Sequence, residues 1–141
     1  MKILLLAVGK PRSRPVREIV EDYCGRIRHY LPFEAASCRD DDAALAALSS
    51  RDFLVALDER GEQKGSEELA RFISCHQSRG TKRMVFFIGG QDGMGDGVRR
   101  RADLLLGLSR MTFPHEIAQA LIAEQIYRAC SIIRGEPYHR V

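Results

Sequence analysis

Five short runs of apolar residues, separated by stretches with apolar positions every three to four residues, dominate the pattern along the chain. The run at residues 2–8 is apolar almost throughout, as expected for a strand that helices cover on both faces. Between the runs, apolar positions at helical spacing predict helices. The predicted strands are residues 2–8, 33–37, 53–57, 84–88 and 104–108. The predicted helices are residues 16–30, 43–48, 66–77, 98–102 and 116–133.

The alternation of strands and helices predicts an α/β fold with a parallel sheet flanked by helices. Gly61 and Gly65 are expected to bound a loop after the third strand. Gly135 ends the last helix, and Pro137 prevents its resumption. The sequence contains no internal repeat, linker or low-complexity segment. We therefore expect a single domain over residues 1–141.

Length and composition exclude several classes of protein. No apolar stretch approaches the roughly 18–20 residues of a membrane helix. The amino-terminal run is short and leads into Gly9-Lys10-Pro11-Arg12 without a small-residue cleavage site, so we expect a buried strand and a cytoplasmic protein. The four cysteines form no C-x-x-C pair, and adjacent Cys75 and His76 have poor geometry for one metal ion. We expect reduced cysteines and no metal.

The charge is unevenly distributed along the chain, although the net charge is only +3. Residues 1–38 carry seven Lys/Arg against four Asp/Glu, and residues 99–141 carry the same numbers. Residues 39–62 carry three against seven. If the two basic ends meet in space, they form a face that suits a polyanion such as RNA. Scattered, solvated charge explains the same numbers equally well.

Three predicted strand ends carry the candidate chemistry, because ligands of parallel α/β sheets bind beyond the carboxyl ends of the strands. These ends are residues 57–59, 89–93 and 109–115. The glycines of the second end allow a ligand to approach the backbone, although a tight turn alone would also explain them. The loop matches neither a phosphate-binding Walker motif nor a dinucleotide-binding fingerprint.

The third strand end and the carboxyl-terminal tail add further candidates. Backbone groups at residues 109–115, with apolar walls from Met111 and Phe113, suit an adenine ring, but an ordinary strand-to-helix loop remains the alternative. His115 begins the long helix and either caps it or contacts substrate. The tail 138–140 offers Tyr for stacking, His as a proton acceptor and Arg for phosphate, or is simply a frayed end.

Four motifs in this order resemble the ribosomal RNA large-subunit methyltransferase H family of the SPOUT class. They are Ile88-Gly89-Gly90-Gln91-Asp92-Gly93, Ser109-Arg110-Met111-Thr112-Phe113-Pro114-His115, Glu124-Gln125-Ile126-Tyr127-Arg128-Ala129 and Pro137-Tyr138-His139-Arg140. The opening Met1-Lys2-Ile3-Leu4, the following Ala7-Val8-Gly9-Lys10 and the pair Leu57-Asp58 are also similar. The resemblance implies a carboxyl-terminal trefoil knot, a homodimer, S-adenosylmethionine as cofactor, and N3-methylation of a pseudouridine in a large-subunit rRNA hairpin, with the ribosome as partner.

The resemblance also assigns residues. The implied cofactor contacts are Leu57, Gly89, Leu108, Ser109, Arg110, Met111, Thr112 and Phe113. The tail residues Tyr138, His139 and Arg140 match the end that this family places by the acceptor, and Arg128 and His115 are candidate substrate contacts.

We hypothesise that His139 takes the acceptor proton or orients the base. In this hypothesis Arg128 and Arg140 hold phosphate or developing charge, and Tyr138 stacks on the base. Two other classes remain open: a ribosome-binding module without catalysis, and a flavodoxin-like nucleotide or flavin binder.

Overall fold

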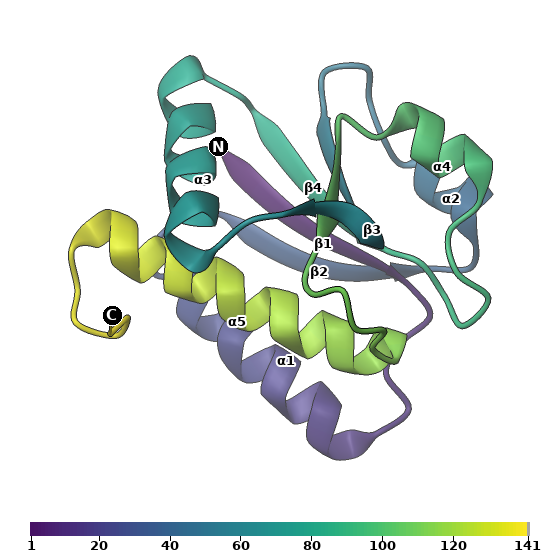
Figure 1. Ribbon diagram of the computed structural model, residues 1–141, viewed down its shortest axis with the longest axis horizontal. Coiled ribbons are helices and arrows are strands. Elements are labelled where there is room, and N and C mark those ends of the chain that lie inside the picture. The colour runs from purple at the N-terminus through teal and green to yellow at the C-terminus, as the bar shows by residue number, and fades with distance from the viewer. Residues whose placement is uncertain (141) are drawn as a thin grey trace.

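The fold is a five-stranded parallel sheet with helices on both faces, seen in a computed structural model that describes residues 1–140 (Figure 1). The strands lie side by side in the order β2-β1-β4-β3-β5. The strands are β1 Lys2–Val8, β2 Phe33–Cys38, β3 Phe53–Gln63, β4 Arg83–Ile88 and β5 Leu104–Gly107. The helices are α1 Arg14–Ile27, α2 Asp41–Ala46, α3 Ser66–Arg79, α4 Asp96–Arg101 and α5 His115–Arg134. The predicted fold class is confirmed.

Two apolar layers cover the sheet, one on each face. Helices α1, α3 and α5 pack on one face, and α2 and α4 lie on the other (Figure 1). The strands supply both layers because successive side chains point to opposite faces. In β1, Ile3 and Leu5 belong to the layer with α5, whereas Leu4 and Leu6 belong to the layer with α2. This explains why β1 reads as a continuous apolar run.

The ends of the helices follow from local sequence signals. Ser13 caps α1 by accepting a hydrogen bond from the backbone N–H of Val16. Helix α1 ends at Ile27, earlier than the predicted residue 30, because residues 28–30 form tighter turns before Pro32. Helix α5 ends at Gly135, whose φ of 74° is left-handed and turns the chain back.

Strand β3 differs most from the prediction. It continues through the polar residues 58–63, so Gly61 lies inside a strand and does not bound a loop. Glu62 and Gln63 pair with Leu106 and Gly107 of β5. A Cβ atom on Gly61 would lie 2.6 Å from the backbone carbon of Leu105, so the backbones of these two paired strands are in direct contact here. The implied trefoil knot stays a prediction.

Other sequence-based expectations concern membranes, metals and thiols. None of the helices within residues 1–140 is both long and apolar enough to span a bilayer. In the same part of the chain, no three His, Cys, Asp or Glu side chains gather as a metal site would require. All four cysteines are free, and burial raises the pKa of the Cys24 and Cys130 thiols to about 11. These two thiols therefore stay protonated and serve the core.

Candidate active site

An open cavity of about 970 Å³ lies at the carboxyl ends of the central strands. Its walls come from loops far apart in the sequence: the segment after β1, residues 57–60 of β3, the loop after β4, and the segment between β5 and α5. The lining residues include Val8, Gly9, Lys10, Leu57, Asp58, Glu59, Gly89, Gly90, Met94, Leu108, Ser109, Thr112, Phe113, His115 and Glu116. The three strand ends selected from the sequence thus meet in one place.

The glycine loop after β4 leaves its backbone open to the cavity. Gly93 has a φ of 84° and its N–H donates to the carbonyl of Gly90 at 2.9 Å, which closes a tight turn. A Cβ atom on Gly89 would lie 3.1 Å from the backbone carbon of Gly93. Only a residue without a side chain fits here without moving the turn, so the glycine turn and the open backbone are both present.

The segment between β5 and α5 forms the opposite wall. The hydroxyl of Ser109 accepts a hydrogen bond from the N–H of Met111 at 3.0 Å, which shapes the turn. Thr112 donates to the carboxylate of Glu59, so this wall is tied to the polar part of β3. Met111 is 73% exposed, a large apolar side chain with little to cover it. Apolar walls beside free backbone groups are the combination that a nucleoside needs.

Charged groups of both signs border the cavity. Burial opposes the ionisation of Asp58, but the backbone N–H of Arg60 and the guanidinium of Arg99 outweigh it and hold the pKa of Asp58 below its usual value. Asp58 is therefore a fixed carboxylate with its partner already in place. Of the cations near the cavity, Lys10, Arg12 and Arg110 form no side-chain ion pair within the described residues.

The structure brings together most of the predicted cofactor contacts. Leu57, Gly89, Leu108, Ser109, Met111, Thr112 and Phe113 all line the cavity, as does His115. Arg110 is exposed and is not among the lining residues, although both its neighbours are. The cofactor contacts remain predictions, and all of them except Arg110 line one cavity.

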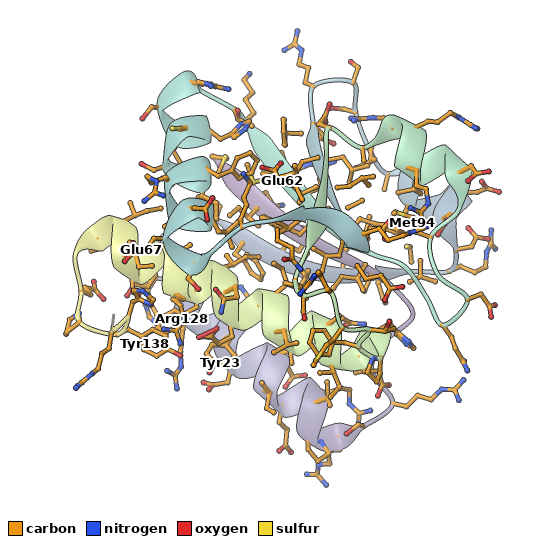
Figure 2. The ribbon with its side chains drawn as sticks, in the orientation of Figure 1. Tyr23, Glu62, Glu67, Met94, Arg128 and Tyr138 are labelled. Carbon is orange, nitrogen blue, oxygen red and sulfur yellow. The ribbon has the colours of Figure 1, made fainter. Side chains whose placement is uncertain are left out.

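The predicted tail residues lie elsewhere. Arg128, Tyr138, His139 and Arg140 do not line the cavity. Arg128 is 13 residues along α5 from His115, or about 20 Å at 1.5 Å per residue. Figure 2 shows Glu67, Arg128 and Tyr138 gathered at the end of α5 that lies far from Met94 of the cavity. Within one chain, the predicted cofactor contacts and the predicted catalytic tail are thus separate.

Side chains of α5 hold the tail in place. After Gly135 the chain folds back, and the Tyr138 hydroxyl donates to Glu124 at 3.1 Å. The ring of Tyr138 packs edge-on against Tyr127, with centroids 4.6 Å apart, and the Arg128 guanidinium lies 4.9 Å from its centroid. The described tail is therefore docked and not frayed. One face of Tyr138 is already occupied, which leaves less ring for the predicted stacking on a base.

Sequence reasoning missed several residues of these two regions. Gly9 follows β1 with a φ of 81°, and Gly9, Lys10 and Arg12 form a wall of the cavity that was not among the predicted site residues. A glycine directly after a buried strand was the available signal. Glu124 was noted only as part of a motif, yet it contacts both Arg128 and the tail. The chain gives no local sign that residues 124 and 138 meet.

Comparison with known proteins agrees with the resemblance. A family model described as "Predicted SPOUT methyltransferase" matches residues 1–139. Curated relatives named ribosomal RNA large subunit methyltransferase H include those of Trichlorobacter lovleyi (42% identical) and Geobacter metallireducens (43%), each aligned over 99% of both chains.

Solved structures agree on the fold. A probable methylase family protein from Haemophilus influenzae gives a TM-score of 0.56 at 9% identity, covering 99% of this chain and 70% of that one. The SpoU methyltransferase AviRb from Streptomyces viridochromogenes, solved with AdoMet, gives 0.54 at 14%, covering 91% and 57%. On the sequence matches, the chain belongs to the SPOUT methyltransferase family, among the relatives named ribosomal RNA large subunit methyltransferase H.

Proposed function

We propose that this protein transfers a methyl group from S-adenosylmethionine to large-subunit ribosomal RNA. One observation carries the proposal: residues 57–60, 89–94 and 108–115, distant in sequence, enclose a single open cavity with exposed backbone and apolar walls. Its volume of about 970 Å³ is sufficient for a nucleoside cofactor. The relatives' names supply the substrate class, and their alignment covers 99% of this chain.

The residues present fit this cofactor. The bare backbone at Gly89 and the turn at Gly93 allow close approach of a ribose or amino-acid chain, and Leu108 and Phe113 offer apolar surface to a base. S-adenosylmethionine supplies an activated methyl group with its own leaving group. The protein's task is therefore to bind, to orient and to exclude water.

We propose that a second copy of the chain completes the site. The tail lies at the far end of α5 from the cavity, so one chain alone does not bring Tyr138 and His139 to the cofactor. Large apolar side chains are exposed along α1 and α5, where a partner would cover them: Ile19 (45%), Ile117 (40%) and Leu121 (37%). A two-fold dimer would bring the tail of each chain to the cavity of the other.

The acceptor follows from the family resemblance. We propose N3 of a pseudouridine in a hairpin of the large-subunit rRNA, reached on the ribosome in the cytoplasm. S-adenosylmethionine would supply the methyl group and leave as a neutral thioether, and the N3 proton would pass to water. Arg140 would stabilise the imide anion or hold phosphate. Lys10, Arg12 and Arg110, which form no side-chain ion pair within residues 1–140, would contact the RNA backbone.

A paired measurement tests the proposal. Calorimetry should detect binding of S-adenosylmethionine to the purified protein, and labelled cofactor should transfer its methyl group to ribosomes from cells that lack this protein. Mass spectrometry of the rRNA should then find one methylated pseudouridine. Binding of ribosomes without cofactor binding would instead identify a non-catalytic ribosome-binding module, and a coloured purified protein would favour a flavin binder.

A further inference from the structure

A series of hydrogen bonds runs from α3 through α5 to His139 of the tail. The Ser66 hydroxyl of α3 donates to Gln125 at 2.7 Å, and the Gln125 amide donates to Glu124 at 3.0 Å. Glu124 accepts from Arg128, with 2.7 Å between its Oε1 and Nη2. Arg128 Nη1 lies 3.0 Å from His139 Nδ1. Glu67, next to Ser66 on α3, lies with its Oε1 3.7 Å from His139 Nε2.

Glu124 accepts most of the hydrogen bonds in this network. Its Oε1 accepts from Arg128 Nε at 2.9 Å and from the Tyr138 hydroxyl at 3.1 Å. The carboxylate thus contacts both the helix cation and the tail. The pairing raises the pKa of Arg128, and burial together with Tyr23 and Glu124 raises the pKa of Tyr138, so both remain protonated donors. Glu124 is partly buried, with its side chain 18% exposed.

The contact between Arg128 and His139 decides which ring nitrogen carries the proton. A guanidinium has only N–H donors and no acceptor. A contact of 3.0 Å from Nη1 to Nδ1 is therefore a hydrogen bond only if Nδ1 has no proton. The neutral ring then carries its proton on Nε2. The doubly protonated ring would point an N–H at a cation.

The Nε2 atom of the His139 imidazole has no hydrogen-bond partner among the described residues. Its nearest charged partner is Oε1 of Glu67 at 3.7 Å, beyond a normal hydrogen bond, and the Glu67 side chain is 52% exposed. Glu67 lies in the first turn of α3 and can be displaced toward solvent. A carbonyl oxygen of a substrate could take its place opposite the Nε2 proton.

We propose that Glu124 and Arg128 hold His139 as the Nε2–H tautomer, so that His139 donates a hydrogen bond to the acceptor base and does not take its proton. This inference rests on the proposed function, and it chooses between the two roles that the sequence left open. The donor would stabilise negative charge on a carbonyl oxygen of the imide as its N–H proton leaves to water. His139 is then the catalytic residue, and Glu124 and Arg128 are positioning residues.

Nitrogen-15 NMR of the labelled full-length protein tests the tautomer directly. The two ring nitrogens have different shifts in each tautomer, and the signals of His139 are those absent from His139→Gln. At a pH where histidine is neutral, we expect Nε2–H in the wild type and a loss of this preference in Arg128→Met and Glu124→Gln. Glu67→Gln is the matched control and should keep the tautomer. A wild-type ring with its proton on Nδ1 would overturn the proposal.

Activity provides the second arm. Gln places an amide donor near the position of Nε2 but cannot act as a base. His139→Gln should therefore keep its rate within about tenfold of wild type, because one neutral hydrogen bond replaces another. His139→Ala should lose at least about a hundredfold. Equal losses in both variants would refute the donor role. A wild type that methylates nothing would refute the proposed function, while the NMR result would still be read independently.

Discussion

The two ends of helix α5 carry two regions built in different ways. At its amino end, the cavity is formed by backbone turns and apolar walls from β3 and from the segments that follow β1, β4 and β5. At its carboxyl end, Glu124, Arg128, Tyr138 and His139 form a dense network of side-chain hydrogen bonds. The first region suits recognition of a cofactor by shape, whereas the second suits precise orientation of donors. The cavity lacks the dense side-chain network, and the tail region lacks the open backbone and apolar walls.

This difference indicates how the proposed chemistry is divided between the cavity and the tail. A site that only binds an activated methyl donor needs room and exposed backbone, and the cavity has both. A site that handles an acceptor proton needs fixed donors, and the tail has these about 20 Å away along the helix. The separation favours a reaction centre made from two chains, and variants that change one region at a time test this division.

Mixing two inactive variants gives the largest expected effect. Gly89→Val damages only the cavity and should keep less than about 10% of wild-type activity at limiting cofactor, whereas His139→Ala damages only the tail and should keep less than about 1%. Unfolded together and refolded, they should recover about a quarter of it, because half the dimers are mixed and each mixed dimer has one intact site. Recovered methyl transfer is the measurement. No recovery, with mixed dimers present, would show that each chain works alone.

Gly89→Val should weaken S-adenosylmethionine binding at least about tenfold, equivalent to about 1.4 kcal/mol. The added side chain meets the backbone of Gly93 and Met94, which shape the cavity. Calorimetry measures the effect. Gly25→Ala is the matched control, because a Cβ on Gly25 meets nothing within 4 Å and Gly25 lies in α1. Equal affinities in the two variants would contradict the cofactor site.

Tyr138→Phe should reduce kcat about threefold to tenfold with no change in cofactor affinity. It removes the hydroxyl that donates to Glu124 but keeps the ring against Tyr127, and a hydrogen bond to a charged group contributes about 1.5 kcal/mol or slightly less when partly exposed. Steady-state kinetics with ribosomes and calorimetry with cofactor separate the two quantities. A change confined to cofactor affinity would contradict the division between the two regions.

Asp58→Asn should produce the smallest effect, about 1 kcal/mol of unfolding free energy at pH 7. The pKa of Asp58 lies below its usual 3.8 in the folded chain, so its contribution is complete above that value. It is then lost as the pH falls through the lower folded pKa. Urea unfolding of both proteins at pH 7 and below pH 4 measures this difference.

Glu18→Gln is the control for that measurement. Glu18 pairs with Arg14 on the exposed surface of α1, so its loss should change stability by less than about 0.5 kcal/mol. A difference between Asp58→Asn and wild type that grew in acid would contradict the assigned direction of the Asp58 pKa.

The sequence predicted elements whose cause is local. The strands β1 and β4 are apolar on both faces because both faces are buried, and that pattern is visible residue by residue. Helix α5 was predicted to within one residue at each end, because Pro114 and Gly135 mark its limits. The strand ends that form the cavity could be chosen because parallel strands place their carboxyl ends together.

Features that depend on distant partners escaped prediction. Residues 58–63 are polar, and they form a strand only because β5 pairs with them more than 40 residues later. Gly61 has the sequence context of a turn glycine but lies where the backbones of β3 and β5 are in direct contact. The dense packing of Tyr138 against Tyr127 and Arg128 arises from the return of the tail along α5, which no periodicity encodes.

Helix α5 therefore sets the distance between the two regions. Its 20 residues separate the cavity at one end from the tail network at the other. In a two-fold dimer, a helix of fixed length would bring the tail of each chain to the cavity of the other by the same geometry. Both proposed reaction centres would then form together or not at all. The proposed dimer would then bind two molecules of cofactor, and no dimer would have only one complete reaction centre.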